Sequence, residues 1–218
     1  MSHSGPRHLK TTFNQDAGLY DRARPHYPAH LFDDLVALAG LHTGTRLLEI
    51  GCGTGQATVP MAQRSFAITC VELGENLATV ARRNLATYPN VSVTTAPFET
   101  WEADGKQFEL VYASQAWHWL DPEVCYTRAA GLLSPRGALA IIDVEHAFPA
   151  GADRFFFDIQ DVYREIGEEI EDEPWPPPLP EDVSDMRHEI EATGLFTDFQ
   201  SRRYVWELMY TADQYWTS

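Results

Sequence analysis

The chain has few cysteines and no long hydrophobic run. Its 218 residues include three cysteines, Cys52, Cys70 and Cys125, none in a C-x-x-C pair. This number and spacing argue against a disulfide framework and a structural zinc, so we expect no metal site. No apolar run reaches the roughly 18 residues needed to cross a bilayer, and the first residues lack a signal-peptide core. We therefore expect a cytoplasmic protein without a membrane partner.

Basic residues are also scarce. Lys and Arg number 16 against 32 acids, which gives a formal charge of −16. Such a charge repels a phosphate backbone unless a local basic stripe compensates. We find only short basic pairs, Arg82–Arg83 and Arg202–Arg203. A nucleic-acid partner is therefore disfavoured.

The chain does contain a regular alternation of short apolar strands and helical segments. Strands are predicted at 45–50, 66–72, 91–95, 108–113 and 138–144. Helices are predicted at 31–41, 57–62, 76–86 and 123–133. This order predicts an α/β fold of the Rossmann-like, doubly wound kind, with a mostly parallel sheet and helices on both faces.

A glycine-rich turn follows the first predicted strand. Three alternate glycines in residues 51–55 let the backbone turn sharply and approach a ligand closely. Glu72 ends the second predicted strand, 21 residues after Gly51. This spacing lets its carboxylate accept hydrogen bonds from both hydroxyls of a ribose. The pattern therefore predicts a nucleoside-cofactor site.

The spacing of the glycines indicates which cofactor binds. A dinucleotide site has the pattern G-x-G-x-x-G, whereas this chain has G-x-G-x-G, with Gln56 where the third glycine would fall. Glu49, two residues before the first glycine, would repel a phosphate. A cofactor with an uncharged or cationic linker fits this turn better than a dinucleotide does.

With Glu49 included, the turn resembles the first motif of the class I S-adenosylmethionine-dependent methyltransferases, (E/D)-x-G-x-G-x-G. Residues 13 to about 145 resemble the small-molecule members similar to trans-aconitate methyltransferase. Five motifs carry this resemblance, in order: Tyr20-Asp21-x-x-Arg24-Pro25-x-Tyr27-Pro28, residues 48–58, Val71-Glu72-Leu73-Gly74, Phe98-Glu99-x-Trp101, and Ala116-Trp117-His118-Trp119-Leu120-Asp121. The resemblance implies S-adenosyl-L-methionine as cofactor and a small organic molecule as methyl acceptor.

The resemblance also assigns cofactor-binding residues. Glu49 and the glycine loop would face the methionine moiety, Glu72 the ribose and Leu73 one face of the adenine. The implied set is Tyr20, Glu49, Gly51, Cys52, Gly53, Gly55, Glu72, Leu73, Pro97, Phe98, Ser114 and Gln115. Many relatives carry an acid for the adenine amino group where this chain has Ala96-Pro97-Phe98. Adenine recognition should therefore depend on the Phe98 backbone and on apolar contact.

The implied substrate pocket is aromatic. Its residues are Arg24, His26, Tyr27, Trp117, His118 and Trp119. Aromatic walls exclude water from the reacting groups, and their π faces attract a sulfonium cation. His118 could act as a general base, because histidine titrates near neutrality, or could be a structural residue. The residues before position 28 could contact substrate or form a surface arm.

The chain is predicted to be a single domain, residues 1–218, with four parts. These are an N-terminal arm or lid (1–30), a cofactor-binding core (31–145), a helical cap insertion with a proline-rich loop (146–180) and a C-terminal helix and strand (181–218). In the arm, prolines stop any helix.

The C-terminal third is expected to differ from the alternating core. A helix is predicted at 155–170, a second at 186–193 and a long strand at 196–210. The sequence ends where another helix would begin, so we interpret this part as incomplete. We expect an exposed sheet edge at the 196–210 strand, which would favour a homodimer.

Three functions are compatible with the motifs to different degrees. The leading one is methyl transfer from S-adenosylmethionine to oxygen, nitrogen or carbon of a small molecule. The alternative is a non-catalytic nucleoside-binding protein that keeps the pocket without turnover. A nicotinamide oxidoreductase is third, because the glycine spacing weighs against it.

Overall fold

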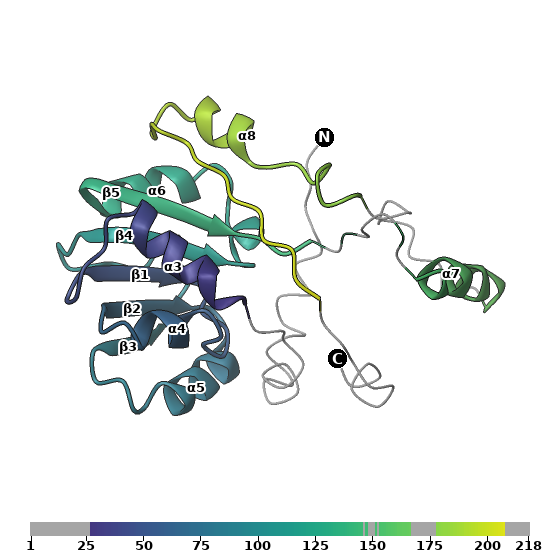
Figure 1. Ribbon diagram of the computed structural model, residues 1–218. Coiled ribbons are helices and arrows are strands. Elements are labelled where there is room, and N and C mark those ends of the chain that lie inside the picture. The colour runs from purple at the N-terminus through teal and green to yellow at the C-terminus, as the bar shows by residue number, and fades with distance from the viewer. Residues whose placement is uncertain (1–26, 146, 148–150, 152, 167–177, 208–218) are drawn as a thin grey trace.

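The computed structural model describes residues 27–145, 147, 151, 153–166 and 178–207 (Figure 1). Several predictions of the sequence analysis lie outside these residues. They concern Tyr20, Arg24 and His26 in the arm, the proline-rich run up to residue 177, and the last residues from 208 onward.

A five-stranded parallel sheet forms the centre of the fold. Its strands are β1 (Arg46–Ile50), β2 (Ala67–Glu72), β3 (Val91–Thr95), β4 (Phe108–Ser114) and β5 (Leu133–Ile142). They lie in the order β3-β2-β1-β4-β5, and every neighbouring pair is parallel. The predicted parallel sheet is thus confirmed. Because the strand order reverses at β1, the loops after β1 and β4 leave a crevice at the carboxyl ends of these strands.

Helices cover both faces of the sheet (Figure 1). They are α3 (Ala29–Leu38), α4 (Thr58–Ala62), α5 (Glu75–Asn84), α6 (Cys125–Leu132), α8 (Arg187–Ala192) and the short 3₁₀ helix η1 (Trp117–Trp119). Leu47 of β1 packs in one core cluster with residues of α3 and α4, whereas Leu48 packs in the other with residues of α6. Successive strand residues point to opposite faces, so β1 is buried on both sides.

The predicted helix at 155–170 is present as α7 (Phe155–Ile166) over the described residues. Figure 1 shows α7 apart from the sheet. Its apolar residues Phe155 and Val162 are 58% and 46% exposed. Its function as part of a cap insertion stays a prediction. Among the residues that the structure describes, no helix combines the length and the apolar character needed to cross a membrane.

Strand β5 begins earlier than the sequence suggested. The predicted strand started at residue 138, but Leu133 already pairs with Phe108, and the next pair joins Ala138 to Leu110. The intervening residues are inserted without partners in the ladder, and Arg136 among them has a φ of +70°. The turn expected between α6 and β5 is therefore an irregularity inside the strand.

The strand predicted at 196–210 is wrong for residues 196–207, which form neither strand nor helix. Its alternation is nevertheless real, since Tyr204 and Trp206 are partly buried while Val205 is 68% exposed. The Tyr204 hydroxyl donates to Asp34 of α3 at 2.8 Å, so the side chain of Tyr204 contacts the helical layer. The exposed sheet edge on which a homodimer was predicted does not form at these residues.

Strand β1 carries one buried acid, and this acid joins four elements. The Glu49 carboxylate accepts hydrogen bonds from Thr58 of α4 at 2.6 Å and from the Tyr112 hydroxyl of β4 at 2.7 Å. The Cys70 thiol of β2 approaches the same oxygen at 3.9 Å. Burial raises the pKa of Glu49 to about 7, although the hydroxyl donors oppose the shift.

Gly51 lets the chain leave β1 close to the segment that follows β4. Its φ is +67°, and a Cβ at this position would lie 2.5 Å from the Cβ of Ala116. Its N–H donates to Val71 of β2 at 2.8 Å, which continues the β1–β2 ladder by one residue. Both the conformation and the close approach therefore require glycine here.

We expect the raised pKa of Glu49 to make stability depend on pH. The folded protein holds this proton up to about pH 7, while the unfolded chain releases it near pH 4.5. The free energy of unfolding should therefore fall as pH rises through 7, by about 1 kcal/mol between pH 6 and pH 8 from this group. Urea unfolding of the wild type and of Glu49→Gln at both pH values measures the difference. Equal pH dependence in the two proteins would contradict the prediction.

We expect Gly51→Ala to lower the free energy of unfolding by more than the strain of a positive φ alone explains. Gly40 has a similar φ of +61° with no atom within 4 Å of a built Cβ, so Gly40→Ala is the matched control. The control should lose about 1–2 kcal/mol, and Gly51→Ala should lose more. Adding Ala116→Gly should restore part of that excess in thermal unfolding. If Ala116→Gly restored nothing, the contact would not be the cause.

Candidate cofactor site

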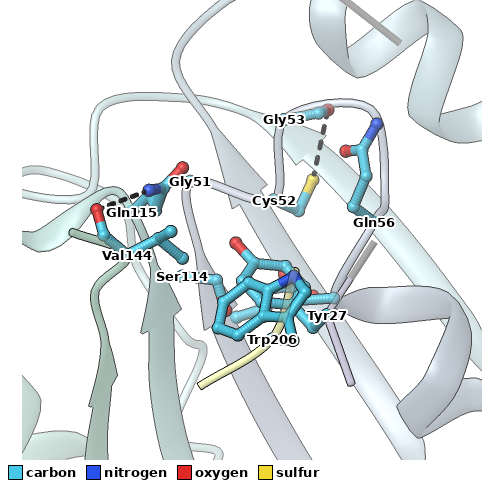
Figure 2. Close-up of a pocket in the computed structure, with 11 residues that line it drawn as sticks. Tyr27, Gly51, Cys52, Gly53, Gln56, Ser114, Gln115, Val144 and Trp206 are labelled. Atoms are coloured by element: carbon cyan, nitrogen blue, oxygen red, sulfur yellow. Dashed lines mark hydrogen bonds between the residues drawn. The ribbon is translucent and has the colours of Figure 1, made fainter. Parts of the chain in front are cut away.

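A cavity lies at the carboxyl ends of β1 and β4, where the strand order reverses (Figure 2). It is lined by Tyr27, Glu49, Gly51, Cys52, Gly53, Gln56, Ala57, Ser114, Gln115, Val144 and Trp206. Its volume, counted as the positions open to the centre of a water molecule, is about 30 Å³. A cavity of this size can hold one end of a nucleoside cofactor, and the remainder must lie outside it.

The glycine loop forms one wall of the cavity. Gly51, Gly53 and Gly55 all have positive φ, at +67°, +57° and +103°. The Gly55 N–H donates to the Cys52 carbonyl at 2.9 Å, and a Cβ on Gly55 would contact the side chain of Leu85. The loop is thus a defined turn that exposes backbone to the cavity, as the sequence predicted.

Glu72 is buried beside this loop. One carboxylate oxygen accepts the Gly53 N–H and the other accepts the Gly74 N–H, both at 2.8 Å. Burial raises the pKa of Glu72, and these backbone bonds oppose the shift. The carboxylate therefore braces the glycine loop against the end of β2. It does not line the cavity, and its assignment to a ribose stays a prediction.

The residues assigned to adenine differ in exposure. Leu73 is 55% exposed, so its side chain offers an apolar surface just beyond Glu72. Phe98 is 3% exposed, and its ring packs in the core with the Arg128 guanidinium 5.6 Å from its centroid. Pro97 is exposed. Leu73 could therefore touch a flat ligand, whereas Phe98 could do so only through its backbone.

Ser114, the last residue of β4, and Gln115 after it also line the cavity. The Gln115 backbone N–H donates to Ile142 at 2.8 Å, and its side chain donates to the Val144 carbonyl at 3.3 Å (Figure 2). These bonds fix the ends of β4 and β5 together. Gln115 has a φ of +52°, an uncommon conformation for a residue other than glycine.

Two aromatic residues complete the wall, Tyr27 and Trp206 (Figure 2). Tyr27 is the one arm residue of the predicted substrate pocket that the structure describes. Trp206 was not identified from the sequence, nor were Gln56, Ala57 and Val144. The available signal in the sequence was the alternation of apolar and polar residues around Trp206, which was interpreted as a strand.

The aromatic segment after β4 is only partly near the cavity, and none of its three residues lines it. Trp117 is 3% exposed and its ring packs 5.0 Å from that of Tyr126 in the core. His118 has a side chain 53% exposed, with Nδ1 3.9 Å from a carboxylate oxygen of Asp143, and its ring lies 4.8 Å from that of Trp119. These residues therefore do not share the cavity wall with Tyr27, and their functional assignments stay predictions.

The cavity cysteine is an unreactive thiol. Cys52 and Cys70 are both buried and not bonded to each other as a disulfide. The neighbouring thiol, burial and nearby carboxylates raise the pKa of Cys52 well above its ordinary value. Burial, with the nearby carboxylates, also raises the pKa of Cys70, although hydrogen bonds oppose the shift. Cys52 is therefore a small neutral part of the wall and not a nucleophile.

The chemistry of the wall fits one end of S-adenosylmethionine. Glu49 offers a buried acceptor to an ammonium group. Ser114 Oγ and Trp206 Nε1 are buried polar atoms without a hydrogen-bond partner among the described residues. Buried polar groups normally have partners, and because Ser114 and Trp206 both line the cavity, a ligand bound there could supply them.

Part of the chain is similar to known methyltransferases. Residues 48–141 match a family model described as a methyltransferase domain. An uncharacterized methyltransferase of Mycobacterium tuberculosis is 29% identical over 136 residues, which cover 62% of this chain and 53% of the relative. A trans-aconitate 2-methyltransferase of Deinococcus radiodurans is 31% identical over 109 residues, which cover 50% and 41%. The chain spans about half the length of the curated relatives it matches.

Among solved structures, the CcbJ methyltransferase from Streptomyces caelestis aligns with a TM-score of 0.49 at 25% identity, over 58% of this chain and 54% of that one. The family match begins in β1 and ends in β5, so it spans the glycine loop, Glu72 and the residues after β4. Residues 48–141 are therefore similar to methyltransferase domains.

Proposed function

We propose that this protein binds S-adenosylmethionine and transfers its methyl group to a small organic molecule. The observation that carries the proposal is the cavity between the glycine loop and the end of β4, with the Glu49 carboxylate at its wall. Glu72 and the exposed Leu73 lie beyond the loop, on the β2 side. The cavity suits the amino-acid end of the cofactor, and the β2 side suits its adenosine.

In this proposal, residues of the chain bind the cofactor and orient it. When bound, the cofactor supplies a methyl carbon that its sulfonium already activates. The glycine loop lets backbone approach the ligand, and Glu72 keeps the loop in place through the Gly53 and Gly74 N–H groups. Tyr27 and Trp206 cover the cavity and exclude water from it.

A small methyl acceptor is favoured by charge. The net charge of −16 disfavours a polyanionic acceptor such as nucleic acid. The relative from Deinococcus radiodurans is named for trans-aconitate, a small molecule, which supports the same class. His118 remains the candidate general base, since it lies after β4 beside Asp143, and Arg24 and His26 remain candidates for contacting the acceptor.

We expect Glu72→Ala to weaken the binding of S-adenosylhomocysteine by at least tenfold. It removes acceptors for charge-assisted hydrogen bonds and also the brace of the glycine loop. Glu75→Ala is the matched control, because Glu75 lies three residues away with a side chain that is 66% exposed. Calorimetry should find the control unchanged. Unchanged affinity in Glu72→Ala would count against the assigned cofactor site.

We expect the affinity for S-adenosylhomocysteine to fall at low pH. Only ionised Glu49 pairs with the ammonium of this ligand, and burial raises the pKa of Glu49 to about 7. The dissociation constant should therefore rise about tenfold between pH 8 and pH 6. The ligand 5′-methylthioadenosine lacks the amino-acid end and should show no such change. If both ligands lost affinity equally at low pH, the cause would be Glu72 or the fold, and not Glu49.

Turnover separates the proposal from the alternative of a non-catalytic binding protein. Labelled S-adenosylmethionine is incubated with a panel of small acceptors that offer oxygen, nitrogen and carbon nucleophiles. Transfer of label to at least one of them is the expected result. Tight cofactor binding without transfer across the panel would favour the non-catalytic alternative.

A further inference from the structure

Trp206 reaches the cavity from a part of the chain outside the family match, which ends at residue 141. Its indole nitrogen is buried and has no hydrogen-bond partner among the described residues. An indole N–H can only donate. A buried donor without a partner is costly, and because Trp206 lines the cavity, an acceptor atom of a ligand bound there would remove that cost.

Two other residues of the cavity wall restrict which ligand groups can bind there. Glu49 borders the same cavity and can accept from a cation. Ser114 Oγ is a second buried group without a partner there. A ligand end that satisfies all three has a positive group for Glu49 and an oxygen acceptor for Trp206 and Ser114, which describes an amino acid zwitterion.

We propose that Trp206 holds the carboxylate of the cofactor's amino-acid end by donating its indole N–H, while Glu49 receives the ammonium. This inference rests on the proposed function, since it assigns a residue to the same cofactor. It adds a binding residue that comes from the C-terminal segment and not from the sheet or its glycine loop.

The segment that carries Trp206 is anchored close to it. The Tyr204 hydroxyl donates to Asp34 at 2.8 Å, and its ring lies 5.1 Å from that of His30. Arg203 donates to the carbonyls of Glu181, at 2.8 Å, and Val183. These contacts attach residues 203 and 204, which precede Trp206, to α3 and to residues 181–183. Trp206 is thereby placed in the wall of the cavity (Figure 2).

The size of the cavity agrees with this assignment. A volume of about 30 Å³ accommodates a small charged group and not a whole nucleoside. The described lining residues include no lysine or arginine. Neutral donors therefore have to satisfy a carboxylate here, and Trp206 and Ser114 are the two whose polar atoms have no partner.

The test compares two ligands on one conservative variant. Trp206→Phe keeps an aromatic ring over the cavity and removes only the N–H. Calorimetry with S-adenosylhomocysteine should show affinity weaker by about tenfold or more than in the wild type, because a hydrogen bond to a charged group is lost. Affinity for 5′-methylthioadenosine, which has no carboxylate, should stay within twofold. Trp101→Phe, a tryptophan of the α6-side core, is the control and should change neither.

The outcomes distinguish the inference from the proposed function. If the wild type binds S-adenosylhomocysteine and Trp206→Phe binds it equally well, the inference is wrong and the cofactor assignment stands. If Trp206→Phe weakens both ligands equally, Trp206 is only a wall of the site and the inference is again wrong. If the wild type binds neither ligand, the proposed function itself fails. Thermal unfolding of each variant confirms that it is folded.

Discussion

The buried carboxylate of Glu49 is the contact on which the rest of the site depends. Thr58, Cys70 and Tyr112 approach one of its oxygens from α4, β2 and β4. A charge in such a place is unfavourable, and its raised pKa shows that cost. A hydrophobic residue would fill the same space without the free-energy cost of burying a charge. We propose that a cationic ligand group completes the pairing of this acid, because Glu49 also borders the cavity.

The site has two halves with different physical character. The half at β1 and β4 is a small cavity with the Glu49 carboxylate in its wall, which suits a charged amino-acid end. The half at β2 offers the exposed Leu73 beside a carboxylate that already holds two backbone N–H groups. The glycine loop joins the halves, because Glu72 fixes it from one side and Ala116 packs against Gly51 from the other.

The parallel sheet and the glycine loop were predictable because local patterns determine them. Buried parallel strands are short apolar runs, and a backbone with positive φ requires glycine wherever the chain turns tightly. The break in β5 was not predictable to the same degree. Its position depends on how Leu133 and Ala138 pair with residues of β4 that are distant in the sequence. The proline and glycine between these two residues do not indicate which residues of β4 they pair with.

The sequence by itself determined the fold class, the glycine loop at residues 51–55 and the acid at position 72, since these follow from periodicity and spacing along the chain. Only the tertiary structure placed Trp206 at the cavity and Trp117 in the core. Alternating burial in residues 204–207 has the period of a strand, but the same period arises when an extended segment packs against a helix. Which neighbour such a segment meets is decided by contacts between distant parts of the chain, and a local pattern contains no information about them.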